Sequence, residues 1–185
     1  INAGNVKLQG FTINLPSDEY GISSSIHAMG DGISIIGNMV GNSSVYLSGS
    51  KLNVTGNSIP EALEVVGSNL IVSNNTIGKT LKIQGFYNLV SYNQIGNSYY
   101  WNGIHLNVSY NCILGNSFST MEIEDSNSNF IFSNAFAGLS LGGCSDNVIS
   151  KNRVTGSGVV NDGISLSEGK NNTFSANSIC NCANG

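Results

Sequence analysis

The hexapeptide Val72-Ser73-Asn74-Asn75-Thr76-Ile77 is followed eighteen residues later by Val90-Ser91-Tyr92-Asn93-Gln94-Ile95. Both match an apolar-x-x-Asn-x-apolar unit, in which one asparagine is held between apolar residues. The unit recurs along nearly all of the 185 residues, and its asparagines are Asn38, Asn57, Asn75, Asn93, Asn116, Asn134, Asn152 and Asn177. Such a regular recurrence indicates a repeat protein.

The spacing of these asparagines indicates the type of repeat. Neighbours are 19, 18, 18, 23, 18, 18 and 25 residues apart, so the basic coil has 18 residues and two coils carry insertions. Eighteen residues are too few for a pair of helices, and 28 Asn, 28 Ser and 23 Gly residues favour turns over helix interiors. We therefore expect each coil to consist of three short strands separated by turns.

We therefore predict an all-β, right-handed parallel β-helix of about eight to nine coils, forming a single domain over residues 1–185. The asparagines are expected to lie in one turn, where Asn can adopt the left-handed αL conformation, and to bond to one another as a ladder. Phe11 takes the ladder position of an earlier coil.

A second strand follows each ladder turn, as in Thr80-Leu81-Lys82-Ile83 and Gly103-Ile104-His105-Leu106. Alternation along a strand directs the apolar residues inward and the residue between them outward. Side chains of neighbouring coils are about 4.8 Å apart. The outward residues then form one external column, namely His27, Tyr46, Glu64, Lys82, His105, Glu122, Ser140 and Ser165.

Composition narrows the class of protein. Hydrophobic residues make up 40%, enough for a continuous core, while charged residues make up only 10% and the net charge is −4. Seven scattered Lys and Arg residues give no basic surface for nucleic acid. No apolar run is long enough to span a bilayer.

Five sequons are compatible with export and glycosylation, which favours an extracellular or cell-surface location. Their asparagines are Asn42, Asn53, Asn74, Asn107 and Asn171. The four cysteines lack the paired spacing of a zinc site, and Cys112 falls at a predicted core position, so buried free thiols are expected. No metal or other cofactor is expected.

These repeats resemble the right-handed parallel β-helix, or pectate-lyase-like, superfamily, and in particular the short N-x-I repeats of its carbohydrate-binding and sugar-hydrolase domains in secreted or surface proteins. The resemblance covers nearly the whole chain and implies the fold. It does not imply one activity, because the superfamily includes lyases, hydrolases, phage tailspikes and adhesins. In its enzymes the substrate lies across one sheet face.

The external column would carry any catalytic group, through His105, Glu122, Lys82 and Glu64. A carboxylate beside a histidine could perform acid/base chemistry on a sugar. The alternative is a set of ion pairs, Glu64 with Lys82 and His105 with Glu122, that keeps like charges apart on adjacent coils.

The insertion in the 23-residue coil supplies the carbohydrate-binding candidates. It carries Tyr99, Tyr100 and Trp101 and leads to His105, with Lys82 beside it. Aromatic rings on an exposed loop can stack on sugars. They could equally pack against the solenoid or a neighbouring subunit.

Two functions follow from this sequence. The first is a non-catalytic structural or adhesin-like surface solenoid that contacts carbohydrate. The second is a polysaccharide lyase or glycoside hydrolase acting on an acidic or neutral glycan. Solenoid ends are usually capped, and no cap is evident in the sequence, so the chain is expected to be a segment of a longer protein or a subunit that stacks end to end. Cys180 and Cys182 could crosslink such subunits.

Overall fold

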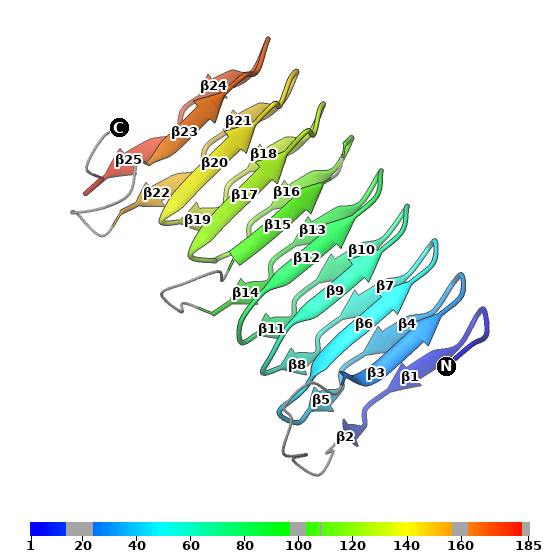
Figure 1. The fold of residues 1–185 in the computed structure, drawn as a ribbon. Coiled ribbons are helices and arrows are strands. Elements are labelled where there is room, and N and C mark those ends of the chain that lie inside the picture. Colours follow the sequence, from blue (N-terminus) through cyan, green and yellow to red (C-terminus); the bar gives the residue numbers. More distant parts are fainter. Residues whose placement is uncertain (14–23, 97–102, 108, 157–162, 183–185) are drawn as a thin grey trace.

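The computed structural model describes residues 1–13, 24–96, 103–107, 109–156 and 163–182. Within these ranges every regular element is a β-strand, none is a helix, and all strand pairs are parallel (Figure 1). The strands stack coil upon coil into a β-solenoid with three faces. The predicted all-β parallel solenoid is therefore confirmed.

Two faces of the solenoid are long sheets. The nine-stranded sheet, here sheet B, consists of β1 (Lys7–Gln9), β4 (Ser34–Ile36), β7 (Asn53–Thr55), β10 (Ile71–Ser73), β13 (Leu89–Ser91), β16 (Cys112–Leu114), β18 (Phe130–Phe132), β21 (Val148–Ser150) and β24 (Thr173–Ser175). The eight-stranded sheet, here sheet A, consists of β3 (Ser24–Met29), β6 (Ser44–Ser48), β9 (Leu63–Val66), β12 (Leu81–Gln84), β15 (Gly103–Asn107), β17 (Thr120–Glu124), β20 (Gly138–Gly142) and β23 (Ile164–Ser167).

The third face, sheet C, is made of shorter strands in two groups. The first group is β2 (Thr12–Ile13), β5 (Met39–Val40), β8 (Ser58–Ile59), β11 (Thr76–Ile77) and β14 (Gln94–Ile95), and the second is β19 (Ala135–Phe136), β22 (Arg153–Thr155) and β25 (Ser178–Cys180). Single bridges from Ser117 to Gln94 and to Ala135 connect the two groups. Sheet C thus follows the solenoid along the same axis as the other two.

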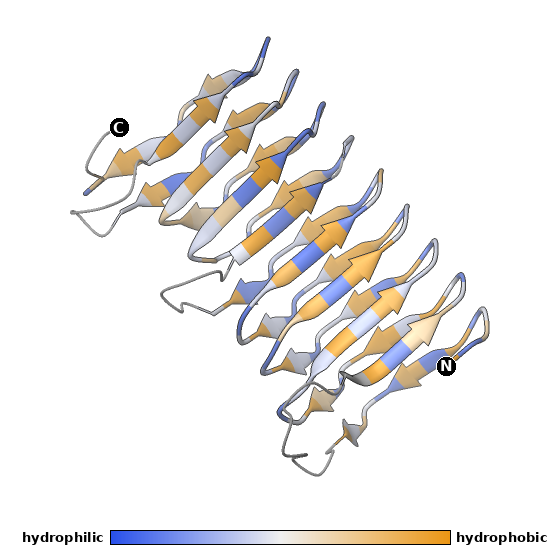
Figure 2. Ribbon diagram, viewed as in Figure 1, coloured by the Kyte–Doolittle hydropathy of each residue, from blue (hydrophilic) through white to orange (hydrophobic). Residues whose placement is uncertain are grey.

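The core consists of the inward side chains of all three sheets. Val54, Val72 and Val90 stack in register and are fully buried. Figure 2 shows the corresponding stripes along the strands of sheet A, where hydrophobic and hydrophilic residues alternate. This alternation is why short strands of only a few residues suffice: each buries its apolar side against the coils above and below.

The asparagine ladder lies in the turn between sheet B and sheet C, as predicted. The backbone N–H and the side-chain Nδ2 of Asn75 both donate to Oδ1 of Asn93, at 3.0 and 2.9 Å, and Asn75 Nδ2 also donates to the Val54 carbonyl. The pattern repeats from Asn38 to Asn177. In the coil before Asn38, Phe11 takes the ladder position and its N–H donates to Asn38 Oδ1. One detail of the prediction was wrong. The residue with positive φ is the one before each ladder asparagine, for example Asn74 (54°), because the turn must bend before the amide points inward.

A second ladder, which was not predicted, lies in the turn between sheet A and sheet B. The N–H of Asn111 donates to Asn129 Oδ1 at 3.0 Å and its Nδ2 donates to the same oxygen at 2.9 Å. Its members are Asn88, Asn111, Asn129, Asn147 and Asn172. In earlier coils the same position holds Ile33, Leu52 and Leu70, so this ladder begins only partway along the solenoid.

All four cysteines are free thiols, but only Cys144 is buried: Cys112 and Cys182 are half-buried and Cys180 is exposed. Cys112 pairs in register with Leu89 and Phe130 on the outward side of sheet B and is half-buried, while the core position is taken by the next residue, Ile113. The assignment of Cys112 to the core was therefore wrong by one residue. Cys144, in contrast, is fully buried as a free thiol.

Candidate functional site

The outward column predicted on sheet A exists in the structure. Glu64 pairs in register with Lys82, Lys82 with His105, and His105 with Glu122. His27 and Tyr46 extend the column at one end, and Ser140 and Ser165 extend it at the other. Parallel in-register pairing is the cause, because it places equivalent residues of successive coils directly beside one another.

Four neighbouring side chains of the column, Glu64, Lys82, His105 and Glu122, form two pairs. Lys82 Nζ lies 3.1 Å from Glu64 Oε1, and His105 Nδ1 lies 3.0 Å from Glu122 Oε2. All four side chains are about one-third to one-half exposed. Water therefore screens both pairs, and each contributes at most about 1 kcal/mol to stability.

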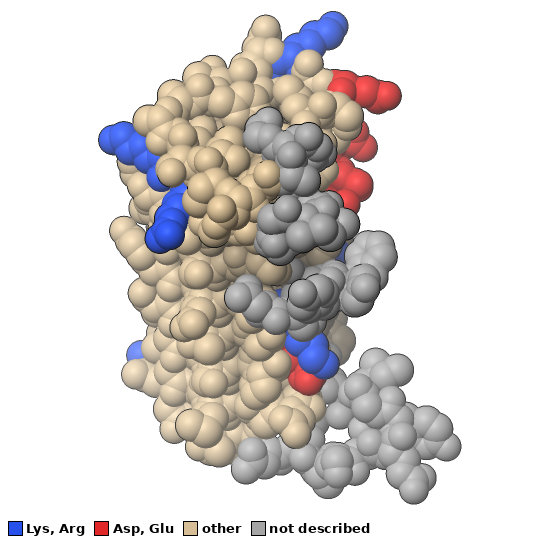
Figure 3. All heavy atoms as spheres, turned by 90° about the vertical axis from the view of Figure 1, so that its left-hand side faces the viewer, with Lys and Arg blue, Asp and Glu red and all other residues tan. Residues whose placement is uncertain are grey.

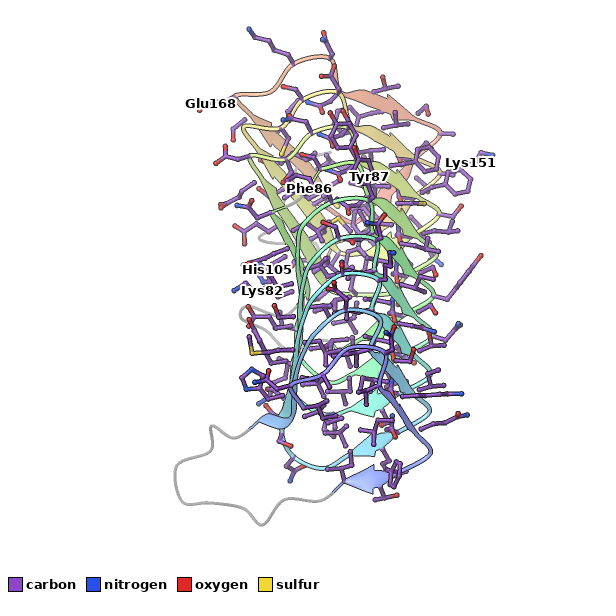
Figure 4. The ribbon with its side chains drawn as sticks, turned by 90° about the vertical axis from the view of Figure 1, so that its right-hand side faces the viewer. Lys82, Phe86, Tyr87, His105, Lys151 and Glu168 are labelled. Carbon is purple, nitrogen blue, oxygen red and sulfur yellow. The ribbon has the colours of Figure 1, made fainter. Side chains whose placement is uncertain are left out.

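A shallow depression of about 220 Å³ lies over this part of sheet A. Its polar lining comes from two neighbouring columns: Lys82, His105 and Glu122 from the first, and Gln84, Asn107 and Glu124 from the second. Figure 4 shows Lys82 and His105 projecting outward from the same face. The depression thus combines one ammonium group, one imidazole, two carboxylates and two carboxamides.

This set of groups allows two kinds of chemistry. Because Glu122 bonds Nδ1 of His105, Nε2 is the ring nitrogen through which His105 could exchange a proton with a ligand. The carboxamides can donate and accept hydrogen bonds with hydroxyl groups, and the carboxylates can accept them, which is what binding of a sugar requires. Binding of a sugar in this way requires no catalytic step.

The structure leaves part of the predicted site untested. Tyr99, Tyr100 and Trp101, the predicted sugar-stacking residues, lie outside the described residues. Among the described residues, no three His, Cys, Asp or Glu side chains gather as a possible metal site. Nor does the described part of the chain contain a helix able to span a membrane.

The sequon asparagines are mostly accessible. Asn42, Asn74, Asn107 and Asn171 are exposed. Asn53 is half-buried and its Oδ1 accepts a hydrogen bond of 2.5 Å from the hydroxyl of Thr55. The four exposed side chains lie where a glycan could be attached without disturbing a ladder.

The structure also reveals an aromatic cluster that was not predicted, in the turn between sheet A and sheet B. Phe86, Tyr87 and Tyr110, here called the aromatic turn, are 51%, 63% and 54% exposed. The rings of Tyr87 and Tyr110 stack with centroids 5.4 Å apart and planes 21° apart. The sequence does carry a signal for them: aromatic residues stand at turn positions where other coils have glycine or a polar residue.

Charge is unevenly distributed over the surface. Figure 3 shows a side of the molecule that is mostly uncharged, with the acidic side chains gathered along one edge. Figure 4 places Phe86 and Tyr87 on the turn, between Lys82 and His105 on one side and Lys151 on the other. The aromatic turn is therefore next to the charged depression but separate from it.

Comparison with models of known protein families finds none that matches this chain, and a search of curated protein sequences finds no similar one.

Proposed function

We propose that this chain is a non-catalytic structural β-solenoid of an extracellular or cell-surface protein, and that sheet A presents a polar face that contacts carbohydrate. The observation that carries the proposal is the pair of asparagine ladders. They tie each coil to the next through buried amides from Asn38 to Asn177 and from Asn88 to Asn172. Among the described residues, Ser43 Oγ is the one buried side-chain polar atom without a partner.

Such a molecule is suited to act as a rigid support. Buried amides that satisfy one another specify a single coil register, since slippage would strand several polar groups away from water. The resemblance to surface domains of the pectate-lyase-like superfamily supports the same role. The pairing of Lys82 with Glu64 and of His105 with Glu122 supports it too, because these contacts occupy part of the polar groups beside the depression.

The alternative is a polysaccharide lyase or glycoside hydrolase. One observation favours it: His105 shares the depression with two carboxylates, those of Glu122 and Glu124. Imidazole and carboxylate together could remove a proton from a sugar and protonate a leaving oxygen. A lyase or hydrolase must turn over its substrate, whereas the non-catalytic solenoid needs only to bind it.

An assay of binding and turnover on the same samples separates the two functions. The chain is incubated with polygalacturonate and with neutral glucans, and binding is followed by calorimetry while unsaturated products and reducing ends are counted. We expect binding without product. Product formation that disappears in His105→Ala, with the fold retained by circular dichroism, would overturn the non-catalytic function.

We also propose that copies of the solenoid stack end to end. In the last described coil the side chains of Leu166, Phe174 and Ile179 are 46%, 40% and 39% exposed and line a hollow, although the same positions one coil earlier are buried. A further β-coil, either from the continuation of a longer chain or from another copy, would cover them and continue the strand pairing of β23, β24 and β25. Sedimentation should show concentration-dependent association that Phe174→Asp abolishes, and a chain that stays monomeric at high concentration would contradict stacking.

A further inference from the structure

We infer that the aromatic turn of Phe86, Tyr87 and Tyr110 is a binding site for an uncharged oligosaccharide, which continues the stack of the two tyrosine rings. The inference deepens the proposed carbohydrate contact and rests on it, but it places the ligand on a different part of the surface from the sheet A depression.

The backbone at the two tyrosines is the first reason. Tyr87 and Tyr110 have φ of 59° and 60°, in the left-handed region, where a bulky side chain costs about 1 kcal/mol. The equivalent residues of other coils, all with positive φ, are Asn5, Gly32, Lys51, Asn69, Ser128, Asp146 and Asn171. Two adjacent coils thus hold a large ring where Gly or Asn would be better tolerated.

Packing within the chain does not account for these rings. Tyr87 and Tyr110 contact each other, yet both remain more than half exposed, and Phe86 beside them is 51% exposed. An exposed apolar cluster at a strained position indicates a contact with something outside the chain.

The shape of the cluster indicates a ring-shaped ligand. In a stack of two rings, each ring turns one face to its partner and leaves the other face open. Beyond Tyr87 the next coil has Asn69, and beyond Tyr110 it has Ser128, which are both small. Because successive coils are about 4.8 Å apart, each open face borders a space about one ring deep. A pyranose can lie there with its C–H face on the tyrosine.

The polar groups around the rings fit an uncharged sugar. The turn residues that flank the cluster, Asn69 on one side and Ser128 on the other, offer carboxamide and hydroxyl groups without charge. Ser68 Oγ and Asn127 Oδ1 already accept from the N–H groups of Phe86 and Ser145, so these two side chains would serve a ligand as donors. In the positive-φ column the nearest charged residues are Lys51 and Asp146, each two coils away. Asp125 lies closer, at the sheet A end of the turn that carries Ser128, and its carboxylate would repel a polyanion.

The size of the cluster argues against a protein partner. About half of each of three aromatic side chains is exposed, on the order of 300 Å² in all. A stable protein interface buries about 800 Å² on each partner, and this cluster is bordered by polar turns instead of more apolar surface. A linear saccharide with two or three contacting rings needs no larger area.

Substitution by asparagine gives a sharp test, since asparagine suits a positive φ and the variants should fold at least as well as the unaltered chain. Binding of cellohexaose, an uncharged oligosaccharide, and of oligogalacturonate is measured by calorimetry. We expect the unaltered chain to bind cellohexaose, and the double variant Tyr87→Asn/Tyr110→Asn to bind it at least tenfold more weakly. The double variant Tyr87→Phe/Tyr110→Phe, which keeps both rings, should retain binding.

Tyr92→Asn is the matched control. Tyr92 also has positive φ (55°) and is 59% exposed, but it lies on the turn between sheet B and sheet C, against Gly115, and no ring of the described residues stacks on it. Its replacement should leave cellohexaose binding unchanged. The inference is overturned if the unaltered chain fails to bind cellohexaose, if it prefers oligogalacturonate, or if the Asn double variant binds normally. Binding that persists in that variant but is lost in Lys82→Ala/His105→Ala would keep the proposed carbohydrate contact and remove only this site.

Discussion

Asn116 shows what one ladder residue does for the coils on both sides of it. Its Oδ1 accepts from the N–H and Nδ2 of Asn93, both at 2.9 Å, and its own Nδ2 donates to Val90 and Leu114 carbonyls and to Asn134 Oδ1. Replacement by alanine removes the acceptor of the buried Asn93 N–H and four further hydrogen bonds of the amide. We expect Asn116→Ala to lower the free energy of unfolding by about 3 kcal/mol, measured by urea denaturation.

Asn42 provides the control for this substitution. It is exposed and lies off both ladders, so Asn42→Ala should change the free energy of unfolding by less than about 0.5 kcal/mol. Equal effects of the two substitutions would show that the ladder amides are no more stabilising than surface asparagines.

Positive φ at single residues supplies a second prediction. Ala176 has φ of 53° and an exposed side chain, and it is the residue before ladder Asn177. Ala176→Gly should raise the free energy of unfolding by about 0.5–1 kcal/mol, because glycine adopts this conformation without steric cost. Ala135→Gly, in strand β19 where φ is negative, should lower it by a similar amount. A loss of stability in both variants would contradict the αL argument.

The turns of this fold differ in how closely the backbone of one coil approaches the backbone of the next. In the turn after sheet A, a Cβ added to Gly67 would lie 1.7 Å from the Gly49 carbonyl oxygen of the previous coil, and φ of Gly67 is 153°. In the turn after sheet B, a Cβ on Gly56 would meet nothing closer than 3.9 Å, although φ is 69°. Two glycines with positive φ are therefore under different constraints.

Alanine substitution should separate them. Gly56→Ala bears only the strain of the left-handed conformation, about 1 kcal/mol. Gly67→Ala must also push two coils apart, which should cost about 3 kcal/mol or more. Thermal unfolding of the two variants measures the difference, and similar melting temperatures would mean that the turn after sheet A can relax without disturbing its neighbour.

The sequence predicted some features of these turns and strands and missed others. The first ladder could be predicted because its asparagine appears in every coil after the first, where Phe11 takes its position, with apolar residues at fixed offsets. The second could not, because Ile33, Leu52 and Leu70 occupy its position in three coils and 28 asparagines conceal the other five. Cys112 was misplaced because a one-residue shift reverses inward and outward in a strand. The ion pair of His105 with Glu122 followed from register alone, whereas the stacking of Tyr87 on Tyr110 depends on turn geometry that the pattern does not contain.

Over the whole molecule, each strand pairs only with the strands of the coils before and after it. Stability in such a solenoid is the sum of contacts between neighbouring coils, so a change in one coil weakens its neighbours first. A titratable group that is buried in one coil therefore changes its ionisation when that coil and its neighbours unfold. Cys144 is such a group, since its side chain is fully buried and its thiol donates to the Gly142 and Ile123 carbonyls at 3.2 and 3.3 Å.

Burial raises the pKa of the Cys144 thiol, because the thiolate would lose its hydration inside the core. The folded chain therefore retains this proton at a pH where the unfolded chain releases it, about 8.5 and above. Stability contributed by the protonated thiol is complete below that pH and is lost as pH rises toward the higher folded value. We expect the free energy of unfolding to fall between about pH 8 and pH 10 more steeply in the unaltered chain than in Cys144→Ala, which has no thiol to ionise. Urea denaturation at several pH values measures both slopes, and parallel slopes would show that the Cys144 thiol ionises in the folded and unfolded chains alike.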